Sequence, residues 1–172
     1  MSALHIADTG FFVAVGDSSN ERYQRVRTFA ERNGITFVVP KRIYEELSGT
    51  KDSESSEAEA IPIDSAIDDG WVRVADSLEY TTPVVSKTMD GIQRYIANAD
   101  DRPADEVERA DPALGALAAQ ALSLGNTTHA YIYTTDIAAG EGEETVLASE
   151  GYDDAVTFVN GFRFIEDLVE DD

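Results

Sequence analysis

The stretch that decides the fold is LHIADTGFFVAV, Leu4–Val15, in which one aspartate, Asp8, interrupts the most apolar run of the chain. Leu4–Ala7 is typical of a short parallel strand that is covered on both faces. Asp8 follows at once, so its carboxylate stands where this strand ends. Ligands of open parallel sheets gather at the carboxyl ends of strands, which makes Asp8 a candidate site residue. The alternative is that Asp8 only caps a short helix beginning near Phe11.

Working outward, further apolar runs alternate with helical patterns. Strands are predicted at Ile35–Val39, Trp71–Val74, Ala130–Tyr133 and Val156–Val159. Helices are predicted over 18–33 with Gly34 as the stop, from Thr82-Pro83 onward, and from Asp111-Pro112 to Gly125. The last of these has a predicted buried stripe of Leu114, Leu117, Ala118, Ala121 and Leu122. This alternation predicts an α/β fold, a three-layer α/β/α sandwich with a mostly parallel sheet. We expect a single domain over 1–172, with a mobile loop rich in acids and serines at about 48–60.

The composition is strongly acidic. The chain carries 34 Asp and Glu against 13 Lys and Arg, three of them lysines, for a net charge of −21. This balance resembles proteins of salt-loving archaea, where molar salt shortens the screening length to about 3 Å and mutes self-repulsion. There is no cysteine, so thiolate metal sites and disulfides are excluded. No apolar run approaches the roughly 18 residues of a membrane span, and the N-terminus lacks the basic flank of a signal peptide, so we expect a cytoplasmic protein.

Because acids are so common, only those in unusual surroundings count as candidates. Asp136 ends the strand in HAYIYTTD, although a turn aspartate would look the same. Glu46 in VPKRIYEEL falls beside the predicted core face of a helix, although a solvated helix acid would need no explanation. Asp111 opens a helix, which an N-cap alone would explain. If these three and Asp8 converge, they repel unless a cation intervenes, and an all-oxygen set suits Mg²⁺ or Mn²⁺.

Asp8 in IADTG, Glu46 in IYEEL, Asp111 in ADPALGALAAQAL and Asp136 in IYTTD resemble the ordered acidic motifs of PIN-domain nucleases. The match spans most of the chain, including a closing strand in VTFVNGFRFIEDL. The resemblance implies a metal-dependent endoribonuclease, often the toxin of a toxin–antitoxin pair, with one or two Mg²⁺ or Mn²⁺ ions. It makes the three aspartates metal ligands, has Glu46 bind metal directly or through water, and makes Thr9 and Thr134 supporting hydroxyls. It also implies an RNA substrate, an antitoxin partner and a homodimer.

The sequence departs from the family pattern in two respects. The stretch between Glu46 and Asp111 is long, and no second aspartate closely follows Asp136, where Glu141 or Glu143 is the substitute. Two other functions stay open. One is a non-catalytic PIN-like module that binds a protein or RNA. The other is a phosphoacceptor domain, although this sequence lacks the paired acids that such a domain has after its first strand.

A net charge of −21 is unusual for an enzyme acting on RNA, since phosphate contacts normally use lysine and arginine. Arg25, Lys41 and Arg42 are candidates for a weakly binding RNA rim. The alternative is that the arginines form local ion pairs with surface acids. His5, His129, Trp71 and the tyrosines at 131 and 133 are interpreted as strand or core residues.

Overall fold

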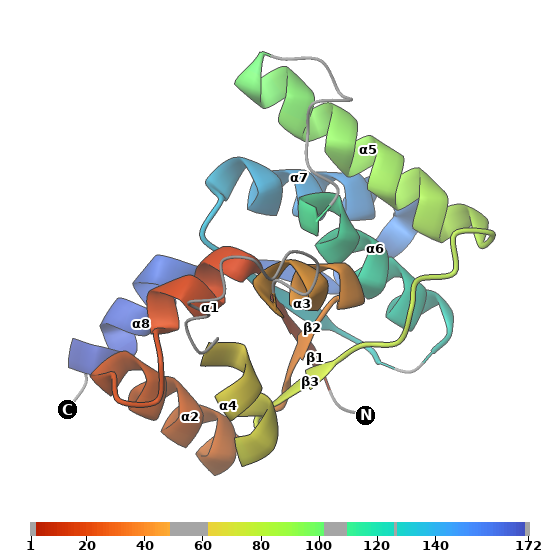
Figure 1. Ribbon diagram of the computed structural model, residues 1–172. Coiled ribbons are helices and arrows are strands. Elements are labelled where there is room, and N and C mark those ends of the chain that lie inside the picture. The colour runs from red at the N-terminus through yellow and green to blue at the C-terminus, as the bar shows by residue number, and fades with distance from the viewer. Residues whose placement is uncertain (1–2, 49–61, 102–109, 126, 171–172) are drawn as a thin grey trace.

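A central five-stranded parallel sheet organises the computed structural model, which describes residues 3–48, 62–101, 110–125 and 127–170. The strand order is β3-β2-β1-β4-β5 (Figure 1). The strands are β1 Leu4–Ala7, β2 Phe37–Val39, β3 Val72–Val74, β4 Ala130–Thr134 and β5 Val156–Asn160. The predicted α/β fold is therefore confirmed, and the sheet is parallel throughout.

Helices cover both faces of this sheet. They are α1 Thr9–Val15, α2 Glu21–Asn33, α3 Lys41–Ser48, α4 Pro62–Asp69, α5 Pro83–Asp100, α6 Ala110–Ser123, α7 Ile137–Leu147 and α8 Gly161–Glu170, with a short π-helical turn, η3 (Ala148–Tyr152), after α7. Helices α1, α2, α4 and α8 lie on one face, while α6 and α7 lie on the other (Figure 1). Helix α5 packs outside α6 and α7. Helix α3 contacts both α1 and α6. No helix among the described residues is long and apolar enough to cross a membrane.

Aromatic side chains fill the layer between the sheet and helices α1, α2 and α8. The Phe11 ring lies 5.4 Å from that of Phe37 and 5.6 Å from that of Tyr133. Trp71, interpreted from the sequence as a core residue, is only 1% exposed. His5 also belongs to this layer, since its Nδ1 lies 2.8 Å from the Tyr133 hydroxyl and burial lowers its pKa. These contacts give the apolar core a rigid, ring-packed form on this side.

Glycines end two helices as predicted, since Gly34 and Gly125 have φ of +64° and +77°. Two details of the predicted elements are wrong. The described part of helix α6 starts at Ala110, and Asp111 is already helical, so Asp111 lies inside the helix instead of preceding it. The predicted stripe on α6 is also too narrow: Ala121 and Leu122 are only half-buried, while Ala113, Ala116 and Ala119 are buried. The reason is that α5 and α7 cover the side of α6 that faces away from the sheet.

The closing segment VTFVNGFRFIEDL is not one strand. Strand β5 ends at Asn160, whose side chain accepts a hydrogen bond from the backbone N–H of Arg163, and α8 begins at Gly161. Phe164, Ile165 and Leu168 then recur at helical spacing and pack on the core. The loop predicted as mobile at about 48–60 lies outside the described residues, apart from Ser48 at the end of α3.

Candidate functional site

The candidate site lies where the sheet topology reverses. Strand β1 pairs with β2 on one side and with β4 on the other, and the chain reaches β4 only after completing β2 and β3. At such a switch point the connections after the two neighbouring strands run to different parts of the sheet and leave a crevice at the carboxyl edge. Asp8 follows β1 and Asp136 follows β4. The two strand-end aspartates predicted from the sequence are thus brought to one edge of the sheet, at the switch point between β1 and β4 where this topology places a crevice. This position is the acidic crevice.

Asp8 is buried, with 3% of its surface exposed. It is also the N-cap of α1, because Oδ1 accepts a 2.8 Å hydrogen bond from the backbone N–H of Phe11. The capping role and the site position, posed as alternatives by the sequence, therefore coexist in one residue. Burial raises the pKa of the Asp8 carboxyl, and the negative charge of Asp136 raises it further. Hydrogen bonds from Thr134 and Phe11 act in the opposite direction.

Thr134 connects the two aspartates. Its hydroxyl donates to Asp8 Oδ2 at 2.5 Å and accepts from the backbone N–H of Asp136 at 3.0 Å. Thr134 itself is fully buried. Because a hydroxyl offers one donor and two acceptor positions, this side chain fixes both the Asp8 carboxylate and the start of the Asp136 turn. By contrast, the other predicted hydroxyl, that of Thr9, is half-exposed and forms no hydrogen bond to any residue the structure describes.

Asp136 is exposed and caps α7 through a 3.1 Å hydrogen bond from the backbone N–H of Ala139 to Oδ1. Asp136 therefore does bind a backbone N–H, as the interpretation as a turn aspartate predicted. Gly10 closes the same region from α1, because a Cβ placed there would lie 2.0 Å from Thr135 Oγ1 and 3.6 Å from Asp8 Oδ1. Gly10 was not predicted from the sequence as a contributor, although its place two residues after Asp8 is a signal for close backbone approach.

Glu46 and Asp111 lie on α3 and α6, two helices that pack against each other. The side chains of both residues lie outside what the structure describes. Among the side chains that are described, no group of three or more His, Asp or Glu is placed to hold a metal ion. The structure therefore brings together Asp8 and Asp136. For Glu46 and Asp111 it shows only that their backbones belong to two neighbouring helices.

The two glutamates proposed as substitutes for a second aspartate differ in their surroundings. Glu141 is exposed on α7, whereas Glu143 is fully buried. A Cβ placed at Gly115 of α6 would lie 3.3 Å from Glu143 Cγ, and Gly115 is one helical turn beyond Asp111. Glu143 is therefore the one of the two that lies against α6, the helix that carries Asp111, and it is the better candidate.

The cations proposed for an RNA rim do not share one surface. Lys41 and Arg42 are exposed at the start of α3 and line one hollow, while Arg25 lies on α2 and lines another. Arg25 also forms an ion pair with Glu21 at 3.3 Å. Among the described residues, neither Lys41 nor Arg42 has an acidic partner within 4.0 Å.

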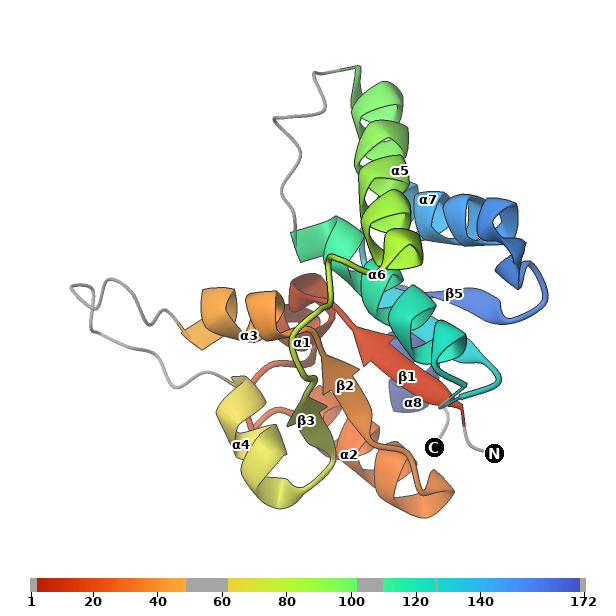
Figure 2. The ribbon, with the colours of Figure 1, turned by 90° about the vertical axis from the view of Figure 1, so that its right-hand side faces the viewer.

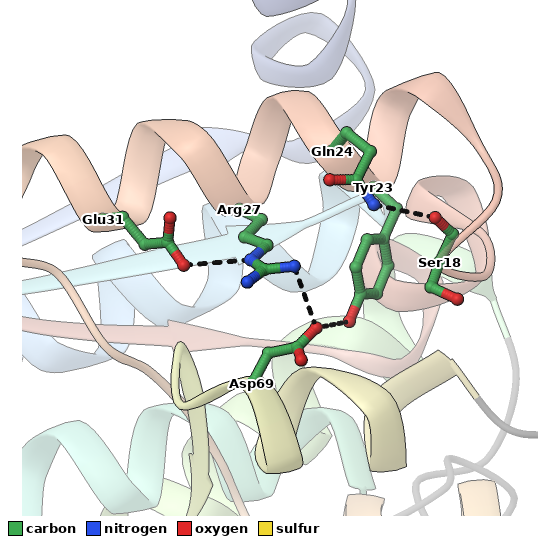
Figure 3. A network of polar contacts seen from close by, with 6 residues as sticks. All are labelled: Ser18, Tyr23, Gln24, Arg27, Glu31 and Asp69. Carbon is green, nitrogen blue, oxygen red and sulfur yellow. Dashed lines mark hydrogen bonds and ion pairs between the residues drawn. The ribbon is translucent and has the colours of Figure 1, made fainter.

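Helix α2 shows how other arginines are used. Arg27 contacts Glu31 at 2.9 Å and Asp69 of α4 at 3.4 Å, and Tyr23 donates a 2.8 Å hydrogen bond to the same aspartate (Figure 3). Burial and the hydrogen bond to Asp69 raise the pKa of Tyr23 to about 12. The local ion pairs considered as an alternative for the arginines therefore do form on this helix, where they join α2 to α4.

The described part of the site fits a hard divalent cation. Its donors are carboxylate and hydroxyl oxygens, the ligands preferred by Mg²⁺ and Mn²⁺. Asp8 is buried and has a like charge, Asp136, acting on it. A cation between the two would offset both the burial of the charge and the repulsion. Asp8 and Asp136 are the described residues that would hold it.

The family described as the halobacterial PIN domain matches residues 1–172. No curated protein matches the chain.

Proposed function

Because the chain belongs to the halobacterial PIN-domain family, and PIN domains are generally nucleases, we propose that it is a metal-dependent endoribonuclease. The proposed active site is the acidic crevice between the carboxyl ends of β1 and β4. The observation that supports it most is the buried Asp8 carboxylate, bonded through the Thr134 hydroxyl to the turn that carries Asp136. Glu46 and Asp111 complete the proposed set of four acids.

The proposed cofactor is Mg²⁺ or Mn²⁺, with one or two ions bound. When bound, such an ion supplies an activated water and stabilises the leaving oxygen of a phosphodiester. Asp8 and Asp136 would bind it, with Glu46, Asp111 or Glu143 as further ligands. Thr134 acts by positioning, since its hydroxyl holds one oxygen of Asp8 while the Phe11 N–H holds the other. Because Asp136 is exposed, a substrate could reach this edge of the sheet from the solvent.

The acidic surface sets the conditions under which RNA would bind. Repulsion between a protein of charge −21 and a polyanion is long-ranged in dilute buffer but is screened within about 3 Å in molar salt. Short-range contacts then dominate. We propose that Lys41 and Arg42 make such contacts from the start of α3, and Arg25 would contribute only to an RNA strand that extends over α2.

The test is cleavage of single-stranded RNA in molar KCl with and without Mn²⁺. We expect cleavage that requires the metal and is lost in Asp8→Asn. Replacing Lys41 and Arg42 by glutamine should slow cleavage, and Arg25→Gln tests separately whether α2 contributes. RNA binding without cleavage under all of these conditions would instead favour the non-catalytic PIN-like module.

The biological setting is a further part of the proposal. We propose that this ribonuclease acts in the cytoplasm as the toxin of a toxin–antitoxin pair. Its partner would be a small antitoxin protein, and the ribonuclease itself would form a homodimer. Expression of the wild-type chain should then inhibit growth, and expression of Asp8→Asn should not. Co-expression of the gene next to it would relieve the inhibition if that gene encodes the antitoxin. Sedimentation of the purified protein in molar KCl tests the dimer.

A further inference from the structure

A second hollow opens at the carboxyl edge of the sheet, on the β2 side of Asp8, and its chemistry differs from that of the acidic crevice. Its volume is about 210 Å³. The buried side chains of Ala113 and Leu117 on α6 form part of its lining. Its exposed lining residues include Lys41, Arg42, Asp76 and Tyr80. An aromatic ring, an apolar wall, two cations and the carboxylates of Asp76 and Glu45 therefore surround one small space.

The hollow lies next to the proposed site because of the strand register. Ile6 of β1 pairs with Val38 of β2, so two residues further along Pro40 comes beside Asp8, at the roughly 5 Å spacing of neighbouring strands. Pro40 also lines the hollow, and Lys41 and Arg42 follow it directly. The hollow and the acidic crevice are thus neighbours along one edge of the sheet.

The far wall of the hollow is held in place by backbone contacts. The chain from β3 to α5, which carries Asp76 and Tyr80, passes beside α6 (Figure 2). The backbone N–H of Glu79 donates a 2.7 Å hydrogen bond to Gln120 Oε1 on α6, and the Tyr80 carbonyl accepts one from the Ser86 hydroxyl. Tyr80 is 46% exposed even so. A large aromatic side chain is thus kept at the surface by its anchored backbone.

We propose that this hollow is a nucleobase subsite, which binds one base of the single-stranded RNA that the adjacent crevice cleaves. The proposal rests on the proposed nuclease function. Single-stranded RNA is recognised by bases that leave the stack, lie against aromatic or apolar surfaces and form hydrogen bonds along their edges, while cations contact the flanking phosphates. Tyr80 and Leu117 supply the surfaces, and Lys41 and Arg42 supply the cations. The volume is below the roughly 300–1,000 Å³ of sites for drug-sized ligands and suits a single planar ring system.

The polar lining also predicts which bases fit. Asp76 offers carboxylate oxygens, which accept hydrogen bonds and do not donate them when ionised. Adenine, cytosine and guanine carry an exocyclic amino donor, whereas the single N–H on the pairing edge of uracil lies between two carbonyl oxygens, which a carboxylate repels. The subsite should therefore prefer an amino-bearing base to uracil, and Asp76→Asn, whose amide both donates and accepts, should reduce that preference.

The experiment measures binding without cleavage, so that it does not depend on the metal chemistry of the proposed function. Fluorescence anisotropy in EDTA and high KCl follows a labelled single-stranded oligoribonucleotide, its all-uridine counterpart and an abasic counterpart. The variants are Tyr80→Ala, Arg42→Gln and Asp76→Asn. Arg94→Gln on α5 and Leu124→Ala, both exposed and outside this hollow, are the matched controls.

We expect Tyr80→Ala to weaken binding of the mixed-sequence strand about fivefold, the lower end for loss of one stacked base. The abasic strand should bind wild type and Tyr80→Ala equally. Arg42→Gln should lower the slope of log affinity against log salt by about 0.7, as for one lost phosphate contact on a single strand. The controls should match wild type.

Equal affinities of wild type and Tyr80→Ala for the mixed-sequence strand would overturn the subsite, as would a loss that is the same for the abasic strand. Absence of any RNA binding by wild type would overturn it too. Failure of the nuclease proposal looks different: the strand binds in a base-dependent manner but is not cut when Mn²⁺ is added.

Discussion

Replacing Asp8 by asparagine separates the charge of this residue from its structural role. Asparagine is as good an N-cap as aspartate, so its side-chain oxygen should keep the hydrogen bond from the Phe11 N–H. Its amide can donate to the Thr134 hydroxyl, which still has a free acceptor position. What disappears is a buried negative charge whose pKa is raised by burial and by Asp136. We therefore expect the variant in EDTA to be at least as thermostable as wild type.

The response to metal should be the opposite. An ion that binds only the folded protein stabilises it by about 2.7 kcal/mol at 100 times its Kd. For a chain of 172 residues, each kcal/mol shifts Tm by about 2–4 °C. Wild type in molar KCl should thus gain about 5–11 °C with saturating Mn²⁺, and Asp8→Asn should gain little. Differential scanning calorimetry with and without Mn²⁺ measures both.

Asp17→Asn is the matched control for this comparison. Asp17 is an exposed aspartate that accepts hydrogen bonds from the Ser19 backbone and hydroxyl, so it shares the local capping chemistry of Asp8 without its burial. Its variant should keep the full Mn²⁺ response. If Asp8→Asn responds to Mn²⁺ as wild type does, or is much less stable in EDTA, then the charge of Asp8 is not there to bind a cation.

Three further outcomes follow from other contacts. Thr134→Val removes a hydrogen bond to a buried carboxylate, so urea titration should show that the free energy of unfolding falls by about 1.5–3 kcal/mol. The affinity for Mn²⁺ should fall as well. An unchanged affinity would show that this hydroxyl does not position Asp8. Gly140→Ala places a Cβ 2.4 Å from the Phe158 ring, so we expect the free energy of unfolding to fall by about 1–3 kcal/mol in the same titration. An unchanged free energy would mean that the ring can move aside. The pKa of Tyr23 is about 12 in the folded protein, against an ordinary value of 10.0 for tyrosine, so its contribution to stability is complete below pH 10 and is lost as the pH rises toward 12. Ultraviolet titration of tyrosinate should lose this late-titrating group in Tyr23→Phe, and a spectrum without any change would contradict the assignment.

The need for salt to stabilise the folded protein also follows from the sequence alone. A net charge of −21 destabilises the compact state through self-repulsion, and salt screens this repulsion. The position of each charge matters little for a sum of this size. Which charges bind ligands is a separate question that composition does not answer.

The sequence by itself determined the local elements. Apolar runs marked the strands, and residues with special backbone roles, such as Gly34 and Gly125 with positive φ, marked helix ends. Asp8 and Asp136 were identified as strand-end acids for the same reason, because the relation between a strand and the residue after it is local. The closing helix α8 was missed because its apolar spacing follows a strand directly, and only the Asn160 cap separates the two.

The tertiary structure alone decided what these elements do together. Strand order is set by long-range pairing, and the order β3-β2-β1-β4-β5 makes β1 and β4 neighbours. That pairing places the Thr134 hydroxyl against Asp8, 126 positions away along the chain. It also separates Arg25 from Lys41 and Arg42, which the sequence had grouped by charge. Side chains far apart in sequence meet only when the sheet register is fixed, and no local pattern encodes that register.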